Sequence, residues 1–261
     1  MEKRHVPLRW LKALEGRYRG NLTTAEFLKA VRALSARYVE RRRTIVGAST
    51  LDSAGKRAAF ASFYAPLHFF TVREIVRALD GPARSADRLI DFGCGTGAAS
   101  AAWALECTSR PSILGVDARG WMRDEAAWTW RSLGLRGRVH VGDMVEHARR
   151  ACHASPRGRP GWLFAWSVNE LDTSARERLL DALANHRPRS SSLLVIEPLA
   201  RAVTPWWDEW ARALGSPDLR CDEWHLAVDL PPELASIDEA AGFDRAYLGA
   251  RSLWRPALAD R

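Results

Sequence analysis

Short apolar runs alternate along this chain with longer amphipathic segments. The apolar runs are largely continuous, which is typical of strands that are buried on both faces of a parallel sheet. They predict strands that end at or near Asp91, Asp117, Val141, Trp166 and Ile196. The segments between them predict helices at residues 98–105, 121–133 and 174–185. This alternation of strand and helix predicts an α/β fold, with a mostly parallel seven-stranded sheet and helices on both faces.

Helical patterns precede the first strand. Residues 7–18 form a basic amphipathic segment, Thr23-Thr24-Ala25-Glu26 is a capping box that opens a second helix, and a third helix runs from Ala59 to Leu79. We therefore expect a helical extension over residues 1–60 and the α/β domain over residues 61–261.

The pattern after the fifth strand is less regular. It predicts a Trp-rich helix from Pro205, and then a strand, a helix and a last strand at residues 224–230, 232–241 and 243–254. One of these strands is expected to run antiparallel to the rest of the sheet.

Composition limits the class of protein. The chain has 261 residues, of which 47% are hydrophobic, so it can bury a full core. No apolar run approaches the ~20 residues that span a bilayer, and no signal-like segment follows Met1, so we expect a cytoplasmic protein without a membrane partner. The four cysteines show no C-x-x-C spacing, which argues against a metal site or a disulfide framework.

The positive charge is concentrated at one end of the chain. Residues 1–60 hold 14 Lys and Arg against 5 Asp and Glu, whereas residues 61–261 hold 25 against 26. The run Arg41-Arg42-Arg43 ends the second predicted helix. The basic extension could bind RNA phosphates, or it could cover a ligand site with its charges in water.

The stretch from Arg88 to Ala99 carries the strongest functional signal. Leu89 and Ile90 lead into Asp91, after which Gly93, Gly95 and Gly97 alternate with other residues before a helical run. Glycines at this spacing allow a tight turn and a close approach of the backbone to a ligand.

Two kinds of ligand fit this turn. Gly93, Gly95 and Ala98 match the G-x-G-x-x-A form of a dinucleotide site, and Asp117 follows at the distance of a ribose-binding carboxylate. However, Asp91 would place a negative charge beside a bound pyrophosphate. S-adenosylmethionine has no phosphate and carries an ammonium and a sulfonium, which Asp91 would favour.

Here the sequence resembles the class I S-adenosylmethionine-dependent methyltransferases, whose first motif is similar to Asp91-Phe92-Gly93-Cys94-Gly95-Thr96-Gly97. The resemblance implies a Rossmann-like fold, S-adenosylmethionine as the cofactor, and a transferase. It also implies that Asp117 binds the ribose hydroxyls, that Asp143 contacts the adenine amine, and that Ser167 lies beside the glycine loop. Tyr64 could contact the methionine part of the cofactor, with core packing as the alternative.

Acceptor-binding residues of this class cluster after the fourth strand. Asn169 and Glu170 lie there, and Glu197-Pro198 follows the fifth strand, so Glu170 and Glu197 are predicted bases and Asn169 a further site residue. The alternative for Asn169 and Glu170 is the start of a helix. The chain lacks the Asn/Asp-Pro-Pro-aromatic tetrapeptide and the Pro-Cys nucleophile of base methyltransferases, which favours methylation of another oxygen or nitrogen.

A weaker resemblance covers residues 64–199. Phe63-Tyr64-Ala65, Asn169-Glu170-Leu171 and Glu197-Pro198 are similar to the methyltransferase-like family associated with the mitochondrial small ribosomal subunit and its bacterial relatives. The cysteine cluster near the C-terminus of that family is absent here. The leading hypothesis is methylation of RNA, in the ribosomal subunit, with residues 1–60 as the RNA contact; the alternatives are a small-molecule acceptor and a catalytically silent ribosome-assembly module.

Overall fold

A computed structural model describes residues 2–18, 22–40, 51, 53–79, 81–154, 158–215, 218–227, 229–243 and 245–258. Its centre is a seven-stranded sheet of β1 (Arg88–Phe92), β2 (Ser112–Asp117), β3 (Gly137–Val141), β4 (Pro160–Ala165), β5 (Ser192–Glu197), β6 (Arg220–Leu226) and β7 (Leu248–Arg255). The strand order is β3-β2-β1-β4-β5-β7-β6, and β7 runs opposite to the other six strands. The prediction of a mostly parallel seven-stranded sheet with one reversed strand is confirmed.

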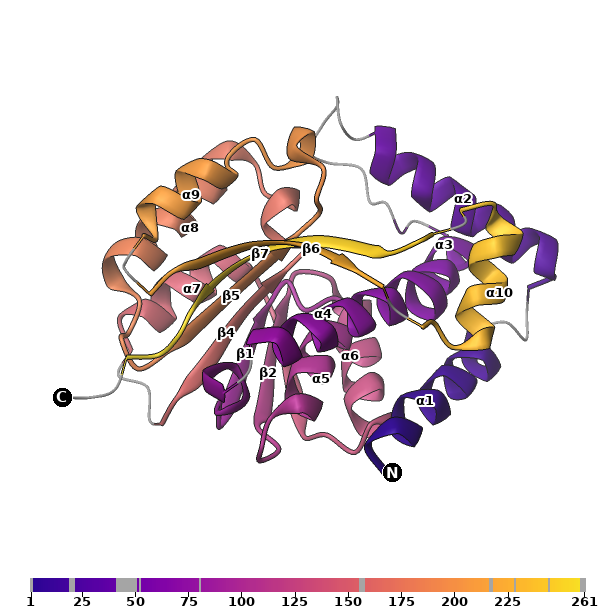
Figure 1. The fold of residues 1–261 in the computed structure, drawn as a ribbon, viewed down its shortest axis with the longest axis horizontal. Helices are drawn as coiled ribbons and strands as arrows, with labels where there is room; N and C mark the ends of the chain where they lie inside the picture. The colour runs from indigo at the N-terminus through magenta and orange to yellow at the C-terminus, as the bar shows by residue number, and fades with distance from the viewer. Residues whose placement is uncertain are drawn as a thin grey trace.

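Helices cover both faces of this sheet (Figure 1). The α-helices are α1 (Glu2–Tyr18), α2 (Thr24–Glu40), α3 (Ala54–Ala59), α4 (Ala65–Leu79), α5 (Ala98–Glu106), α6 (Gly120–Ser132), α7 (Met144–Cys152), α8 (Thr173–His186), α9 (Trp207–Ala213) and α10 (Pro232–Ala241). Short helical turns are η1 (Phe60–Tyr64), which is a π-helix, and the 3₁₀ turns η2 (Gly81–Arg84), η3 (Val168–Glu170) and η4 (Arg201–Val203).

Alternate residues of each central strand enter two different cores. Leu89 and Leu163 face the cluster formed with α1, α2, α4, α5, α6 and α10, whereas Ile90 and Trp162 face the cluster formed with α7, α8 and α9. Because both faces are covered, the strands contain few polar residues, which is why their apolar runs are visible in the sequence. The Trp-rich segment packs in the second core, since Trp207 and Trp210 are buried.

The N-terminal helices belong to the first core. Trp10 of α1 and Phe27 of α2 are buried in it, and the Trp10 ring lies 5.2 Å from the ring of Phe69. The predicted capping box is present: the Thr23 N–H donates to Glu26 Oε2 at 2.9 Å, and the Glu26 N–H donates to Thr23 Oγ1 at 3.3 Å. Residue 60, the predicted domain boundary, falls within the continuous helical stretch of α3, η1 and α4.

The C-terminal strands depart most from the expected bounds. β6 begins at Arg220 and ends at Leu226, so the predicted range of 224–230 lies too late in the chain. The first part of β6 is Arg-Cys-Asp-Glu, and an edge strand with exposed polar side chains gives no apolar signal. β7 begins at Leu248, five residues after the predicted start. No helix among the described residues combines the length and the apolar character needed to cross a bilayer.

Candidate active site

The glycine loop joins the end of β1 to α5. Gly93, Gly95 and Gly97 have φ values of +75°, +51° and +74°, in the left-handed region that favours glycine. A Cβ on Gly93 would lie 2.5 Å from Cβ of Ser167, and one on Gly97 would lie 2.7 Å from Nε1 of Trp130. A Cβ on Gly95 would have no atom within 4 Å. Gly93 and Gly97 are therefore required by packing within the protein, whereas Gly95 leaves its open side to a ligand.

Asp117 connects this loop to the end of β2. Its Oδ2 accepts a hydrogen bond from the Gly95 N–H at 3.0 Å, and its Oδ1 accepts one from the Arg119 N–H at 2.9 Å. Each carboxylate oxygen has more than one lone pair, so both can still accept a hydrogen bond from a ligand hydroxyl. The side chain is only half-buried. The geometry thus joins an accessible carboxylate to the backbone of Gly95.

Asp91 lies at the end of β1 and is 1% exposed. Its Oδ2 has no hydrogen-bond partner in the structure. Burial raises the pKa of Asp91 to about 7, an effect that hydrogen bonds from Ser100 partly oppose. A buried carboxyl without a full set of partners can hold a proton or interact with a cation.

Two other predicted cofactor residues make local contacts. Asp143 is exposed, and its Oδ1 caps α7 by accepting from the N–H groups of Val145 and Glu146. Tyr64 is buried, and its hydroxyl donates to the backbone oxygen of Val31 in α2 at 2.9 Å. The structure therefore places Tyr64 in the core, one of the two roles considered for it, and brings its hydroxyl to α2.

The loop after β4 adjoins the glycine loop. The Ser167 hydroxyl donates to the backbone oxygen of Phe92 at 2.9 Å, which ties the ends of β1 and β4 together. Glu197, at the end of β5, is 0% exposed, and its Oε1 accepts from the N–H groups of Val168 and Asn169 at 3.0 and 3.2 Å. Glu197 therefore holds the η3 turn in place.

Two buried polar atoms at this sheet edge have no partner: Oε2 of Glu197, at the end of β5, and Oδ1 of Asn169, in η3. Burial raises the pKa of Glu197 to about 8, although the two backbone N–H bonds oppose this shift. The carboxyl group therefore carries a proton at neutral pH. Buried polar atoms are nearly always hydrogen-bonded in native proteins, so two orphans at this edge indicate a place for a ligand or water.

Glu170 is the exposed carboxylate of the group. Its Oε2 lies 3.9 Å from Nη2 of Arg119, and both side chains are more than a third exposed. This contact connects the loop after β2 with the loop after β4. The alternative given for Asn169 and Glu170 is partly correct, because they lie in η3 and Asp172 caps α8 through the Ala175 N–H.

Two site residues were missed in the sequence. Trp166, directly after β4, has a φ of 52°, and it is the one residue other than glycine with positive φ among those described. Its ring stacks on His68 of α4, with centroids 3.9 Å apart and an interplanar angle of 8°. Trp166 could have been noticed in the sequence, because it directly follows a predicted buried strand. Nothing near His68 in the sequence indicates that its ring contacts a residue so distant in the chain.

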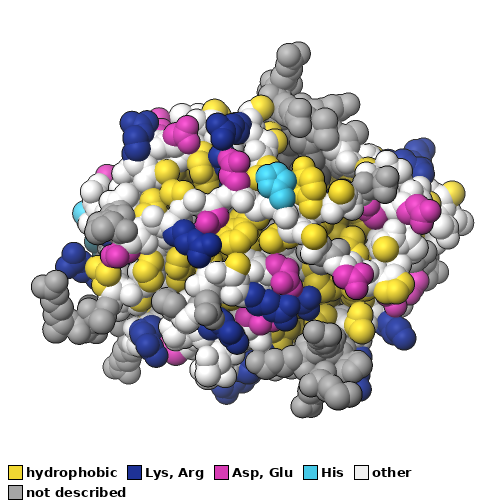
Figure 2. Space-filling view, viewed as in Figure 1, with side chains coloured by type: hydrophobic (Ala, Val, Ile, Leu, Met, Phe, Trp, Pro, Cys, Tyr) yellow, Lys and Arg dark blue, Asp and Glu magenta, His cyan; other side chains and the backbone are white. Residues whose placement is uncertain are grey.

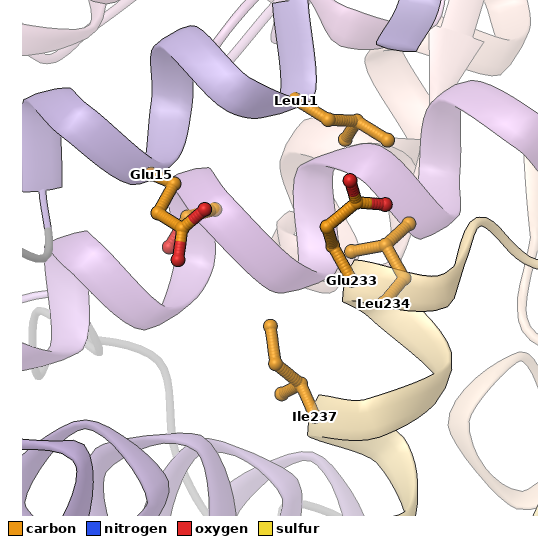
Figure 3. A pocket seen from close by; sticks show the side chains of 6 residues that line it. Leu11, Glu15, Glu233, Leu234 and Ile237 are labelled. Atoms are coloured by element: carbon orange, nitrogen blue, oxygen red, sulfur yellow. The ribbon is translucent and has the colours of Figure 1, made fainter.

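A small cavity lies away from these loops, between α1, η1 and α10 (Figure 3). Its volume is about 20 Å³, and its wall includes Glu15 and Glu233. This is room for about one water molecule, so the cavity is no candidate for a nucleotide-sized ligand. Within the described part of the chain, no group of three or more His, Cys, Asp or Glu residues is arranged to hold a metal ion.

Comparison with known proteins identifies the fold. No family model and no curated protein matches the sequence. Among solved structures, an O-methyltransferase family protein from Burkholderia thailandensis is similar with a TM-score of 0.54 and 16% identity, over 95% of this chain and 77% of that chain. A candidate O-methyltransferase from Nostoc punctiforme is similar with a TM-score of 0.54 and 12% identity, over 89% and 70%.

These likenesses concern the arrangement of the whole sheet and its helices. The chain therefore has the fold of the S-adenosylmethionine-dependent methyltransferases, as the motif around its glycine loop predicts.

Proposed function

We propose that this protein is an enzyme that transfers a methyl group from S-adenosylmethionine to an oxygen or nitrogen nucleophile. One observation carries the proposal. Gly95 has open space where a Cβ would stand, and its N–H donates to the half-buried carboxylate of Asp117. A glycine surface beside a carboxylate suits a nucleoside, whose ribose offers two hydroxyls to one acceptor group.

The other predicted residues would hold the remaining parts of the cofactor. Asp91, with its orphan Oδ2, would interact with the cationic end, since a nearby cation favours the ionised carboxyl. Asp143 is exposed beyond the end of β3 and would accept from the adenine amine. Ser167 would contribute indirectly, because its hydroxyl already joins β4 to β1.

The cofactor supplies an electrophilic methyl group when it is bound, so the protein has to align the nucleophile and accept its proton. Glu170 is exposed enough to receive that proton and stays the predicted base. Glu197 fits a different task. Its raised pKa keeps it protonated at neutral pH, so we propose that it positions η3 and offers a hydrogen bond from Oε2. Asn169 Oδ1 would accept from the acceptor molecule.

We further propose a small molecule as the acceptor. Several basic residues of the N-terminal helices have structural partners: Arg17 lies 2.7 Å from Oε1 of Glu125, and Arg32 donates to the backbone oxygens of Ala240 and Ala241. Cations held in this way are less available to phosphates. On the face seen in Figure 2, Lys and Arg side chains are scattered among acidic ones rather than gathered in a patch. The similar O-methyltransferase structures fit an oxygen nucleophile.

RNA is the second candidate, and the observation that favours it is the excess of positive charge in residues 1–60. Arg41, Arg42 and Arg43 lie outside the described residues, so the contacts above do not include them. We propose that the described part of residues 1–60 forms a fixed cover of the α/β domain, because its helices share that domain's core.

The first experiment tests cofactor binding. Calorimetry should show binding of S-adenosylhomocysteine, which Asp117→Ala and Gly95→Val should weaken at least about tenfold, by removal of about 1.4 kcal/mol or more of binding free energy. Asp124→Ala, which removes an exposed carboxylate of α6, is the matched control and should bind normally. Binding of NADH without binding of S-adenosylhomocysteine would overturn the proposal.

The second experiment identifies the acceptor class. The protein is incubated with methyl-labelled S-adenosylmethionine and cell extract, with and without ribonuclease, and the products are separated by size. Label in a small-molecule fraction that ribonuclease does not alter supports the first proposal. Ribonuclease-sensitive label of high mass would establish RNA instead. Cofactor binding without any label transfer would favour a silent module.

A further inference from the structure

Three aromatic rings from distant parts of the chain form a row beside the glycine loop. They are Phe60 of η1, His68 of α4 and Trp166 after β4. The His68 and Trp166 rings are stacked at 3.9 Å, and the Phe60 ring meets His68 edge-on at 6.2 Å and 77°. We call these three residues the ring row.

The backbone under this row has an unusual conformation at two points. Trp166 has a φ of 52°, a region that a bulky residue adopts only at some cost in free energy, of about 1 to 3 kcal/mol. Its N–H is held by the backbone oxygen of Ile196 at 2.8 Å. On the other side, Phe60 belongs to a π-helix that leads into α4, and such segments are frequent at functional sites.

The row lies at the edge of the first core, against which Phe60 and Trp166 pack. All three side chains keep intermediate exposure, unlike the neighbouring Phe63 and Phe69, which are fully buried. His68 is nevertheless so closely surrounded by protein atoms that desolvation lowers its pKa to about 4. At neutral pH the ring is an uncharged flat surface, on which another ring can stack.

Polar atoms without partners lie at the end of the row. Trp166 is followed by Ser167, whose Cβ lies against Gly93, so the row begins next to the glycine loop. Asn169 Oδ1, in η3, is buried and unpartnered, and so is Oε2 of Glu197, the residue of β5 whose Oε1 accepts from that turn. Glu197 is 0% exposed. Asn169, three residues after Trp166 in the chain, keeps intermediate exposure.

We propose that the ring row binds a planar aromatic molecule that carries a hydroxyl group, with the ring stacked at Trp166 and His68 and the hydroxyl at Asn169. This inference rests on the proposed function in one respect, namely that the aromatic molecule is the methyl acceptor. As a binding site, it stands on the rings and the two orphan atoms alone. The residues involved are positioning residues for the acceptor.

The test uses 2-naphthol as the probe, and decahydro-2-naphthol as a probe of similar size and polarity without aromatic rings. Binding is measured by calorimetry to the full chain, with and without S-adenosylhomocysteine. We expect 2-naphthol to bind at least fivefold more tightly than the saturated alcohol. Trp166→Leu and His68→Leu should each weaken 2-naphthol binding at least fivefold.

Trp128→Leu is the matched control, because Trp128 is also a partly buried Trp but packs beside Arg17 and α1. It should bind 2-naphthol as the unchanged protein does. If a ring-row variant does not fold, nuclear Overhauser contacts between 2-naphthol and the Trp166 or His68 ring of the unchanged protein answer the same question.

The outcomes separate this inference from the proposed function. Equal binding of the two probes, or equal loss in Trp128→Leu and Trp166→Leu, would overturn the ring row as an aromatic site. Binding of a uridine decanucleotide that depends on Trp166, without binding of 2-naphthol, would also overturn it and favour RNA. Binding of 2-naphthol at the ring row without any S-adenosylhomocysteine binding would leave the site standing and refute the methyltransferase proposal.

Discussion

Two carboxylates at the same edge of the sheet, one at the end of β2 and one at the end of β5, do the same structural task in different surroundings. Asp117 and Glu197 each accept two backbone N–H bonds and so each fix a loop. Asp117 uses one oxygen for each bond and stays half-buried, whereas Glu197 uses Oε1 for both, is fully buried and leaves Oε2 without a partner. We call the regions around them the Asp117 side, residues 93–97 with 117–119, and the Glu197 side, residues 166–170 with 197.

The difference shows how one sheet edge can offer two kinds of site. On the Asp117 side the loop is already held by hydrogen bonds, and its open surface is ready for a ligand. On the Glu197 side the turn is held as well, but two buried polar atoms have no hydrogen-bond partner. In addition, Trp166 has a strained backbone with a positive φ. The predictions below test this contrast through the free energy of unfolding, from the largest expected effect to the smallest.

Alanine at Gly93 should have the largest effect. Its Cβ would lie 2.5 Å from Ser167 Cβ, at a φ of +75° that alanine adopts poorly, so we expect a loss of about 3 to 5 kcal/mol. Gly95→Ala has the same backbone problem but open space, and should lose only about 1 kcal/mol. Urea denaturation of both variants provides the measurement. Equal losses would show that Gly93 is not a packing point between the two sides.

Removal of each carboxylate should have the next largest effect on the free energy of unfolding, and the effect should differ between the two sides. Glu197→Ala leaves two backbone N–H groups unpaired in a buried place and opens a cavity, so about 2 to 4 kcal/mol should be lost. Asp117→Ala should lose less, about 1 to 2 kcal/mol, because water can reach its half-buried position.

Glu197→Gln is the control for Glu197→Ala, since a neutral amide can keep both N–H bonds and should lose about 1 kcal/mol or less. It also tests the chemistry. If Glu197 is a base, Glu197→Gln should abolish methyl transfer; if it positions η3, the variant should keep most of its activity.

The sequence predicts the Asp117 side better than the Glu197 side for a physical reason. Strand ends and glycine turns are local, because buried strands need continuous apolar runs and left-handed turns need glycine. Gly93, Gly95 and Asp117 could therefore be identified before the fold was known. The partners of Glu197 and Trp166 lie on other elements, and no local rule connects them.

Other outcomes follow the same division. For Tyr64 the sequence leaves cofactor contact and core packing open, and the bond of its hydroxyl to Val31 depends on the packing of α2, which no local pattern shows. β6 was placed too late because its exposed first residues carry no apolar signal. His68 is separated from Trp166 by almost a hundred residues, so its ring contact exists only in the folded chain.

The pH dependence of stability should be intermediate in size. Burial raises the folded-state pKa of Glu197 from 4.5 to about 8. Below about pH 4 the carboxyl is protonated in both the folded and the unfolded state, so its raised pKa does not lower the stability. As the pH rises towards 8, the unfolded chain releases this proton whereas the folded chain keeps it. Stability is therefore lost with rising pH, by up to about 2 kcal/mol for this group between pH 6 and 8.

Denaturation at several pH values checks this dependence. Glu197→Gln should flatten the curve between pH 6 and 8. Asp91→Asn should flatten it mainly below pH 7, because burial raises the pKa of Asp91 only to about 7. A curve that rises with pH in the unchanged protein would mean that the two carboxyls are ionised when folded.

The smallest effect is expected where the two sides touch. Arg119 and Glu170 form the ion pair between them, but the atoms are 3.9 Å apart and both side chains are more than a third exposed, so solvent screens the pair. A double-mutant cycle of Arg119→Gln and Glu170→Gln should give a coupling below about 0.5 kcal/mol. Turnover is the independent readout, since a base role for Glu170 predicts that Glu170→Gln slows methyl transfer about a hundredfold or more while S-adenosylhomocysteine binds unchanged. A strong coupling with no loss of turnover would make Glu170 a structural link between the sides, and proton removal would then fall to water or to the acceptor's own ionisation.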